Sequence, residues 1–84
     1  MNYTVTWETD VLSVLATIWL QATDRQAVTR AQAAIDRQLT RDPLSYSTPV
    51  SEGLYAIEDP PLRVQFEVLE EDRLVTIVSD RPVP

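Results

Sequence analysis

The chain of 84 residues contains no cysteine, no histidine and no lysine, and all seven of its basic residues are arginines. Without cysteine it forms no disulfide and has no thiolate nucleophile. Without histidine it lacks an imidazole general base, a Ser-His-Asp triad and a histidine-based zinc site. Without lysine it forms no Schiff base. Any catalysis would therefore use carboxylates, arginines, hydroxyls or tyrosines.

Phosphate-binding loops and metal loops are also missing from the sequence. Gly53 is the only glycine, so no glycine-rich phosphate loop is present. The carboxylates gather at turns without the Asp-x-Asp-x-Asp-Gly order of a calcium loop. We therefore expect no cofactor and no bound metal.

No segment of the sequence is typical of export or of a membrane span. Residues 1–4 have neither the basic nor the apolar part of a signal peptide. The longest apolar-rich run, Val11 to Leu20, is far too short to cross a bilayer. We expect a cytoplasmic protein with no membrane association and a single domain over residues 1–84.

The net charge of −6 is concentrated in the second part of the chain. Residues 50–84 hold eight carboxylates and three arginines, a net charge of −5, whereas residues 1–49 have a net charge of −1. This imbalance argues against tight binding to a phosphate backbone and favours a basic partner surface. Repulsion among these carboxylates eases when they are protonated, so we expect mild acidification not to destabilise the protein at first.

The hydrophobic pattern predicts an α+β fold in the order β-α-α-β-β-β. Alternation indicates strands at 3–8, 54–58, 62–69 and 74–78, and apolar stripes at 11–19 and 27–39 indicate two helices. We expect a helical hairpin packed on one face of a mostly antiparallel four-stranded sheet. Residues 44–53 are expected to form a polar connection, and prolines are expected to keep the tail 80–84 out of the sheet. The predicted core comprises Val5, Trp7, Leu15, Ile18, Trp19, Val28, Ile35, Val64, Phe66 and Val68.

Five arginines are candidates for binding. Arg63 lies on the polar face of the strand at 62–69, where it either forms an ion pair with Glu67 or a neighbouring strand, or binds a ligand. Arg81 follows the last predicted strand, where it is either an ordinary surface arginine paired with Asp80 or lies on a flexible tail that can swing it over the sheet. The other three share one outer face of the second helix, which is either solvated or a strip for a partner: Arg30, Arg37 and Arg41.

Four pieces of the sequence, in this order, resemble toxins of the RelE/ParE superfamily. They are the opening Tyr3-Thr4-Val5-Thr6-Trp7, the helix pair with Ile18-Trp19 and Ala34-Ile35-Asp36-Arg37-Gln38-Leu39 before Asp42-Pro43, the run Glu52-Gly53-Leu54-Tyr55 leading to Leu62-Arg63-Val64-Gln65-Phe66-Glu67-Val68, and the closing Val75-Thr76-Ile77-Val78 with Arg81. The resemblance covers about residues 3 to 81.

The resemblance implies a toxin of a type II toxin–antitoxin pair, with a cognate antitoxin as its partner. Some members of the superfamily cut messenger RNA on the ribosome and others act on DNA gyrase, so the resemblance implies these as candidate targets. By position, Arg63 matches the strand arginine that contacts phosphate in the ribonucleases, and Arg81 matches the arginine that stabilises the reacting phosphate. These two are the candidate catalytic residues.

The chain departs from the ribonuclease pattern because Glu58 and Asp59 lie where the nucleases carry lysines. This favours a toxin-like component that acts mainly through protein binding, with weak or no ribonuclease activity. Two alternatives stay open: a ribosome-dependent messenger-RNA endoribonuclease that uses Arg63 and Arg81, and a non-toxic acidic binding or scaffold protein. The sequence does not decide whether the chain is an enzyme.

Overall fold

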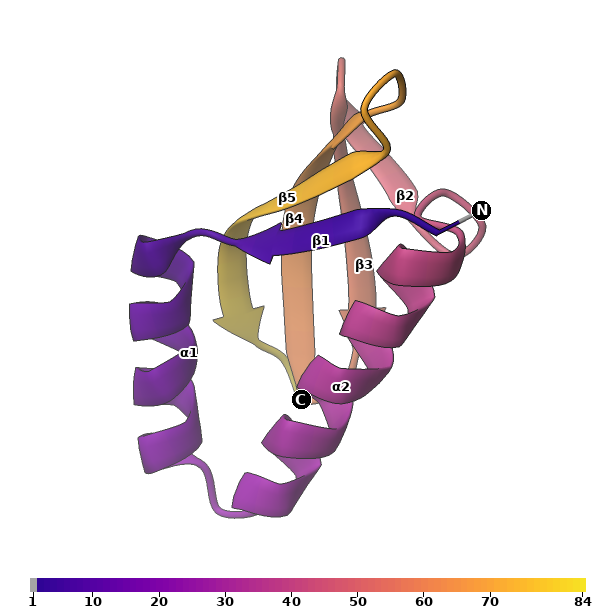
Figure 1. Ribbon diagram of the computed structural model, residues 1–84. Coiled ribbons are helices and arrows are strands. Elements are labelled where there is room, and N and C mark those ends of the chain that lie inside the picture. The colour runs from indigo at the N-terminus through magenta and orange to yellow at the C-terminus, as the bar shows by residue number, and fades with distance from the viewer. Residues whose placement is uncertain (1) are drawn as a thin grey trace.

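The computed structural model describes residues 2–84, which form five strands and two helices (Figure 1). In chain order these are β1 (Thr4–Trp7), α1 (Thr9–Gln21), α2 (Arg25–Arg41), β2 (Thr48–Ser51), β3 (Leu54–Asp59), β4 (Leu62–Leu69) and β5 (Leu74–Pro82). None of the helices in this part of the chain is long and apolar enough to cross a membrane.

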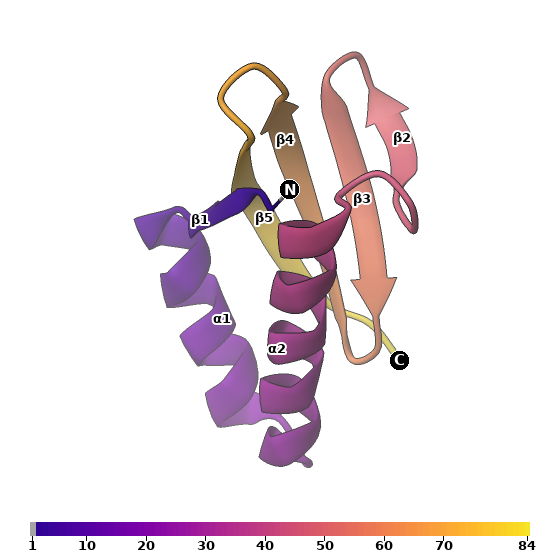
Figure 2. The same ribbon diagram turned by 45° about the vertical axis from the view of Figure 1, so that its right-hand side comes forward.

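One mixed sheet holds all five strands in the order β1-β5-β4-β3-β2. β1 runs parallel to β5, and every other neighbouring pair is antiparallel. The two helices, joined by a short turn, lie against one face of the sheet (Figures 1 and 2). The predicted α+β fold with a helical hairpin on a mostly antiparallel sheet is confirmed, with five strands in place of four.

The additional strand, β2, lies in the segment 44–53 that was expected to be a connection. All four of its residues are exposed, so it has no apolar face for a sequence pattern to reveal. It is an edge strand that pairs only with β3 and contains Pro49 opposite Tyr55. Proline is tolerated at an edge because one side of the strand needs no N–H donor.

The last strand is longer than expected. β5 extends to Pro82, so Asp80 and Arg81 belong to the sheet and not to a free tail, as the prediction had it. β1 ends at Trp7 opposite Ile77, so beyond this point β5 has β4 on one side and no strand on the other. Pro82 is therefore in an edge position, where its missing N–H costs little.

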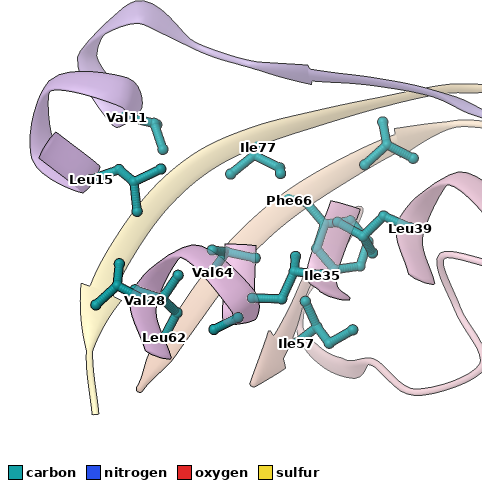
Figure 3. Close-up of a cluster of buried hydrophobic side chains, with 12 residues drawn as sticks. Val11, Leu15, Val28, Ile35, Leu39, Ile57, Leu62, Val64, Phe66 and Ile77 are labelled. Carbon is teal, nitrogen blue, oxygen red and sulfur yellow. The ribbon is translucent and has the colours of Figure 1, made fainter. Parts of the chain in front are cut away.

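The core lies between the sheet and the helices, and Figure 3 shows side chains from both layers meeting there. Five of the predicted core residues are buried: Leu15, Val28, Ile35, Val64 and Phe66. Val5, Trp7, Ile18 and Val68 pack against the core but are only partly buried. Trp19 was predicted wrongly, because it is 39% exposed. Its ring lies 4.8 Å from the Arg25 guanidinium in a cation–π contact, which keeps it at the surface.

Asp80 on β5 faces the helix-covered side of the sheet near the core. It lies opposite Val64, whose side chain is fully buried. Neither carboxylate oxygen of Asp80 is exposed or finds a hydrogen-bond partner within residues 2–84. Burial raises the pKa of Asp80 to about 6, and the nearby Arg81 backbone N–H offsets only part of that rise. The folded state therefore holds a proton on Asp80 more tightly than the unfolded chain does.

We predict that Asp80→Asn stabilises the protein at neutral pH and has less effect in acid. The stability that Asp80 gains by protonation is present below its unfolded pKa of 3.8 and is lost as the pH rises through about 6. The variant should raise the free energy of unfolding at about pH 7 by of the order of 1 kcal/mol, because Asp80 as a residue is only partly buried and solvent around it weakens the effect. Denaturant unfolding at about pH 7 and pH 4 measures the difference. Glu71→Gln, at an exposed turn carboxylate, is the matched control, and an equal or lower stability of Asp80→Asn at neutral pH would contradict the prediction.

Candidate functional site

The candidate site lies on the open face of the sheet, which we define as the side turned away from the helices. β4 directs Leu62, Val64 and Phe66 into the core, and all three are fully buried. The residues between them point to the other side because side chains alternate along a strand. Arg63 and Gln65 are therefore on the open face, as the alternation predicted.

The structure brings the two predicted arginines together. Arg63 on β4 lies directly opposite Arg81 on β5, so both side chains leave the same face of the sheet from neighbouring strands. Arg81 is exposed, whereas the Arg63 side chain is 26% exposed. Two guanidinium groups in this position repel each other unless an anion lies between or beside them. The arrangement can therefore bind a phosphate or a carboxylate by charge-assisted hydrogen bonds.

Glu58 on β3 already supplies one such carboxylate. It lies opposite Arg63 on the side away from Arg81, and Arg63 Nη1 is 3.5 Å from Glu58 Oε1. Of the two ion pairs considered for Arg63, the one with a neighbouring strand is formed. A partly exposed pair of this length contributes little stability. It does mean that an incoming phosphate competes with Glu58 for Arg63.

The next row of the open face is neutral. Ser79 on β5 donates a hydrogen bond of 3.2 Å from its hydroxyl to Oε1 of Gln65. These two side chains were not identified from the sequence, although the alternation of β4 already placed Gln65 on the polar face. They can orient a bound group, but neither is a strong acid or base.

None of the described tyrosines lies in the Arg63–Arg81 row. Tyr55 lies opposite Phe66, and the two rings stack at 5.9 Å on the helix-covered side of the sheet. Tyr46 is in the loop before β2 and is 73% exposed. Tyr3 donates its hydroxyl to Glu70, and this hydrogen bond raises the pKa of the phenol by favouring its protonated form. Within residues 2–84, the open-face row can hold an anion, and its one acid–base group, Glu58, is engaged in an ion pair with Arg63.

The carboxylates do not form a metal centre in residues 2–84, where no three acidic side chains are arranged to hold an ion. Asp80 and Arg81 are neighbours in the sequence, but the strand directs them to opposite faces of the sheet. The ion pair between Arg81 and Asp80 is therefore not formed. Arg81 stays available on the open face.

Comparison with known proteins gives matches in structure but not in sequence. No protein-family model matches the chain, and no curated protein matches it in sequence. The toxin–antitoxin complex RelBE2 from Mycobacterium tuberculosis gives a TM-score of 0.80 at 19% identity, covering 98% of this chain and 99% of that one. The archaeal RelE–RelB complex from Pyrococcus horikoshii gives 0.73 at 18% identity, covering 98% and 96%. The intact Escherichia coli RelBE complex gives 0.68 at 14% identity, covering 98% of both.

These similarities establish that the chain has the fold of RelE toxins, as the sequence resemblance indicated. The match extends over nearly the whole of this chain and of the three compared chains. The identities are all below 20%, so they bear on the fold and leave the site to be judged on its own residues.

We predict that Glu58→Gln increases the affinity of the open face for phosphate. Removing the carboxylate frees Arg63, so inorganic phosphate should bind roughly two- to fivefold more tightly, the range of an exposed ion pair. Amide chemical shifts of residues 63 and 81 during a phosphate titration measure the change.

Glu67→Gln is the matched control, because Glu67 is a carboxylate on the same face that forms no ion pair with Arg63. Equal gains in both variants would mean that only the net charge matters. Addition of Arg81→Ala to Glu58→Gln should cancel the gain if the two arginines share one anion.

Proposed function

We propose that this chain is the toxin-like component of a type II toxin–antitoxin pair and that it acts mainly by binding proteins. The observation that carries the proposal is a RelE-like fold over 98% of the chain in which, within residues 2–84, the Arg63–Arg81 row holds no tyrosine and its Glu58 carboxylate is paired with Arg63. The fold supports the toxin-like role. The open face supports binding over catalysis.

The composition of the open face supports weak or no ribonuclease activity. RNA cleavage by transfer of a phosphoryl group needs both stabilisation of charge and movement of protons. Arg63 and Arg81 can supply the first, but Glu58, the carboxylate beside them, is held in an ion pair with Arg63 and is poorly placed to supply the second. Loss of general acid–base catalysis lowers a rate by roughly 100- to 10,000-fold.

The proposed partner is a cognate antitoxin polypeptide. The similar structures from M. tuberculosis and P. horikoshii are complexes of a toxin with its antitoxin. In this chain α1 leaves the large apolar side chains of Leu12 and Trp19 exposed beside one pocket, and an exposed apolar patch is typical of a protein-binding surface. An antitoxin segment that crosses the sheet and the helices would cover this surface and pair with Arg63 and Arg81. A ribosome or DNA gyrase is the proposed cellular target.

A second candidate function is ribosome-dependent cleavage of messenger RNA. The direct opposition of Arg63 and Arg81 on adjacent strands favours it, because two guanidinium groups can clamp one phosphate. In this alternative Arg63 contacts the scissile phosphate and Arg81 stabilises its developing charge.

We predict that the double variant Arg63→Ala/Arg81→Ala still arrests growth when it is expressed in a bacterium. This result would mean that the open face contributes little to toxicity. If the reading frame next to the gene of this protein encodes the antitoxin, its co-expression should relieve the arrest in both the parent and the variant. Cell density after induction is the measurement, with circular dichroism of the purified variant as the control for folding.

The other outcomes distinguish the alternatives. Loss of both growth arrest and ribosome-dependent RNA cleavage in a folded double variant would replace the proposal with the ribonuclease function. Absence of any growth arrest by the parent chain, together with no relief by a neighbouring reading frame, would favour a non-toxic binding or scaffold protein.

A further inference from the structure

The buried carboxylate of Asp80 is next in the sequence to Arg81, one of the two arginines on the open face. It lies opposite Val64 on β4, and Val64 is fully buried. Both carboxylate oxygens are buried, and neither has a hydrogen-bond partner within residues 2–84. Buried polar atoms without a partner are rare in folded proteins and call for an explanation. Packing alone gives none, because an apolar residue would fill this position at lower cost.

Asp80 belongs to a part of β5 that fewer neighbours hold in place. We call residues 79–82 the terminal segment of β5. β1 pairs with β5 only as far as Ile77, and Figure 1 shows β5 continuing beyond β1. The register between β5 and β4 shifts at Val78, which has no partner on β4. A bulge therefore separates the terminal segment from the first part of β5, and beyond it the only strand that pairs with β5 is β4.

The elements nearest to β5 on this side of the sheet bring no counter-ion to Asp80 within the described part of the chain. β1 contains no charged residue, and Asp10 is the only charged residue of α1. Glu8, between these two elements, and Asp10 are both exposed. These two carboxylates are also negative, so they do not neutralise an ionised Asp80.

The charged residues of α2 and β4 do not pair with Asp80 either. Asp36 accepts a hydrogen bond from the tryptophan of β1. Arg63 and Glu67 on β4 lie on the open face, because side chains alternate along a strand. The basic residues of α2 are all exposed: Arg25, Arg30, Arg37 and Arg41. Burial is therefore the main influence on Asp80. It raises the pKa of this carboxyl to about 6, and the backbone N–H of the next residue acts in the opposite direction.

We propose that Asp80 is a positioning residue for Arg81 and that its protonation controls anion binding on the open face. With a proton on Asp80, the terminal segment lies against the core and Arg81 stays opposite Arg63. Without the proton, the uncompensated charge draws the terminal segment towards water, and Arg81 leaves its place beside Arg63. An oxyanion therefore binds more tightly to the protonated protein. The inference does not depend on the proposed toxin-like function, because it concerns only the anion site.

Two effects of the charge on Asp80 act in the same direction. A buried charge without a partner is strongly unfavourable, and a local opening that brings the carboxylate to water removes most of that cost. The charge also repels an anion held by the next residue, since repulsion between charges acts over about 8 Å at physiological salt. Binding and protonation are therefore linked. The linkage is reciprocal, so a bound anion raises the pKa of Asp80 by as much as protonation strengthens binding.

Glu58 is the other carboxylate that can make anion binding depend on pH. It is 3.5 Å from Arg63, so it competes with an anion for that guanidinium until it is protonated. Glu58 lies on β3, on the side of Arg63 that is away from Arg81. Replacement of each carboxylate in turn by its amide separates the two contributions.

Titration of the full chain with sulfate, followed by nuclear magnetic resonance, tests the inference. Sulfate is the probe because, unlike phosphate, it keeps the same charge over the pH range used. The amide shifts of residues 63 and 81 should show roughly three- to tenfold tighter binding at about pH 5 than at about pH 7.5. Asp80→Asn should bind sulfate equally well at both pH values. Glu58→Gln, the matched control, should keep the pH dependence of the parent.

Two further measurements examine the linkage and the movement separately. In the unaltered protein, the carboxyl carbon shift of Asp80 reports its protonation, and saturating sulfate should raise the midpoint of this titration by about 0.5 to 1 on the pH scale. At neutral pH, amide hydrogen exchange at residues 79–81 should be slower in Asp80→Asn than in the parent. Exchange at residues 75–77, which β1 also holds, should change less.

Four results would each overturn the inference. The first is an unchanged pH dependence in Asp80→Asn, or its loss in Glu58→Gln. The second is an Asp80 titration that sulfate does not move. The third is equal exchange of residues 79–81 in the parent and in Asp80→Asn. The fourth is the absence of sulfate binding at residues 63 and 81 at both pH values.

Discussion

The alternation along β4 is the constraint on which the remaining structure depends. β4 lies in the middle of the sheet, between β5 and β3, so its register decides which side chains of three strands share a face. The burial of Leu62, Val64 and Phe66 fixes that register, because a slip of one residue would place Arg63 and Gln65 under the helices. The same packing that builds the core therefore positions Arg63 and Arg81 on the open face of the sheet.

The sequence was sufficient to predict elements whose residues have one apolar face. β4, β5 and both helices have such a face, and their order led to the correct α+β architecture. β2 could not be predicted, because all four of its residues are exposed. It pairs with β3 by adding to the edge of the sheet, and this pairing does not depend on the burial of apolar side chains. The end of β5 was missed for a related reason. Proline usually marks the end of a strand, and only the position of β1 shows that Pro82 lies at an edge.

The site was partly predictable from the sequence. The alternation placed Arg63 on the polar face, and the structure adds that Arg81 lies directly opposite it. The Glu58–Arg63 pair was also within reach, because residues on either side of the Pro60–Pro61 turn pair symmetrically in a hairpin. The sequence did not show that Asp80 and Arg81 lie on opposite faces of the sheet. Adjacent opposite charges suggest an ion pair until their residues are known to lie in a strand.

The pairing of β1 with β5 joins positions that are far apart in the chain. Thr4 lies beside Leu74, seventy residues later, and Tyr3 also donates its backbone N–H to Thr40 at 2.7 Å. During synthesis β1 therefore stays unpaired until β5, near the end of the domain, has also been synthesised. Long-range contacts of this kind slow folding and leave the apolar residues of β1 and α1 accessible to chaperones or to an early-binding partner. The position of the first strand in the sequence therefore determines when the apolar residues of β1 and α1 become buried, as well as where they lie in the folded domain.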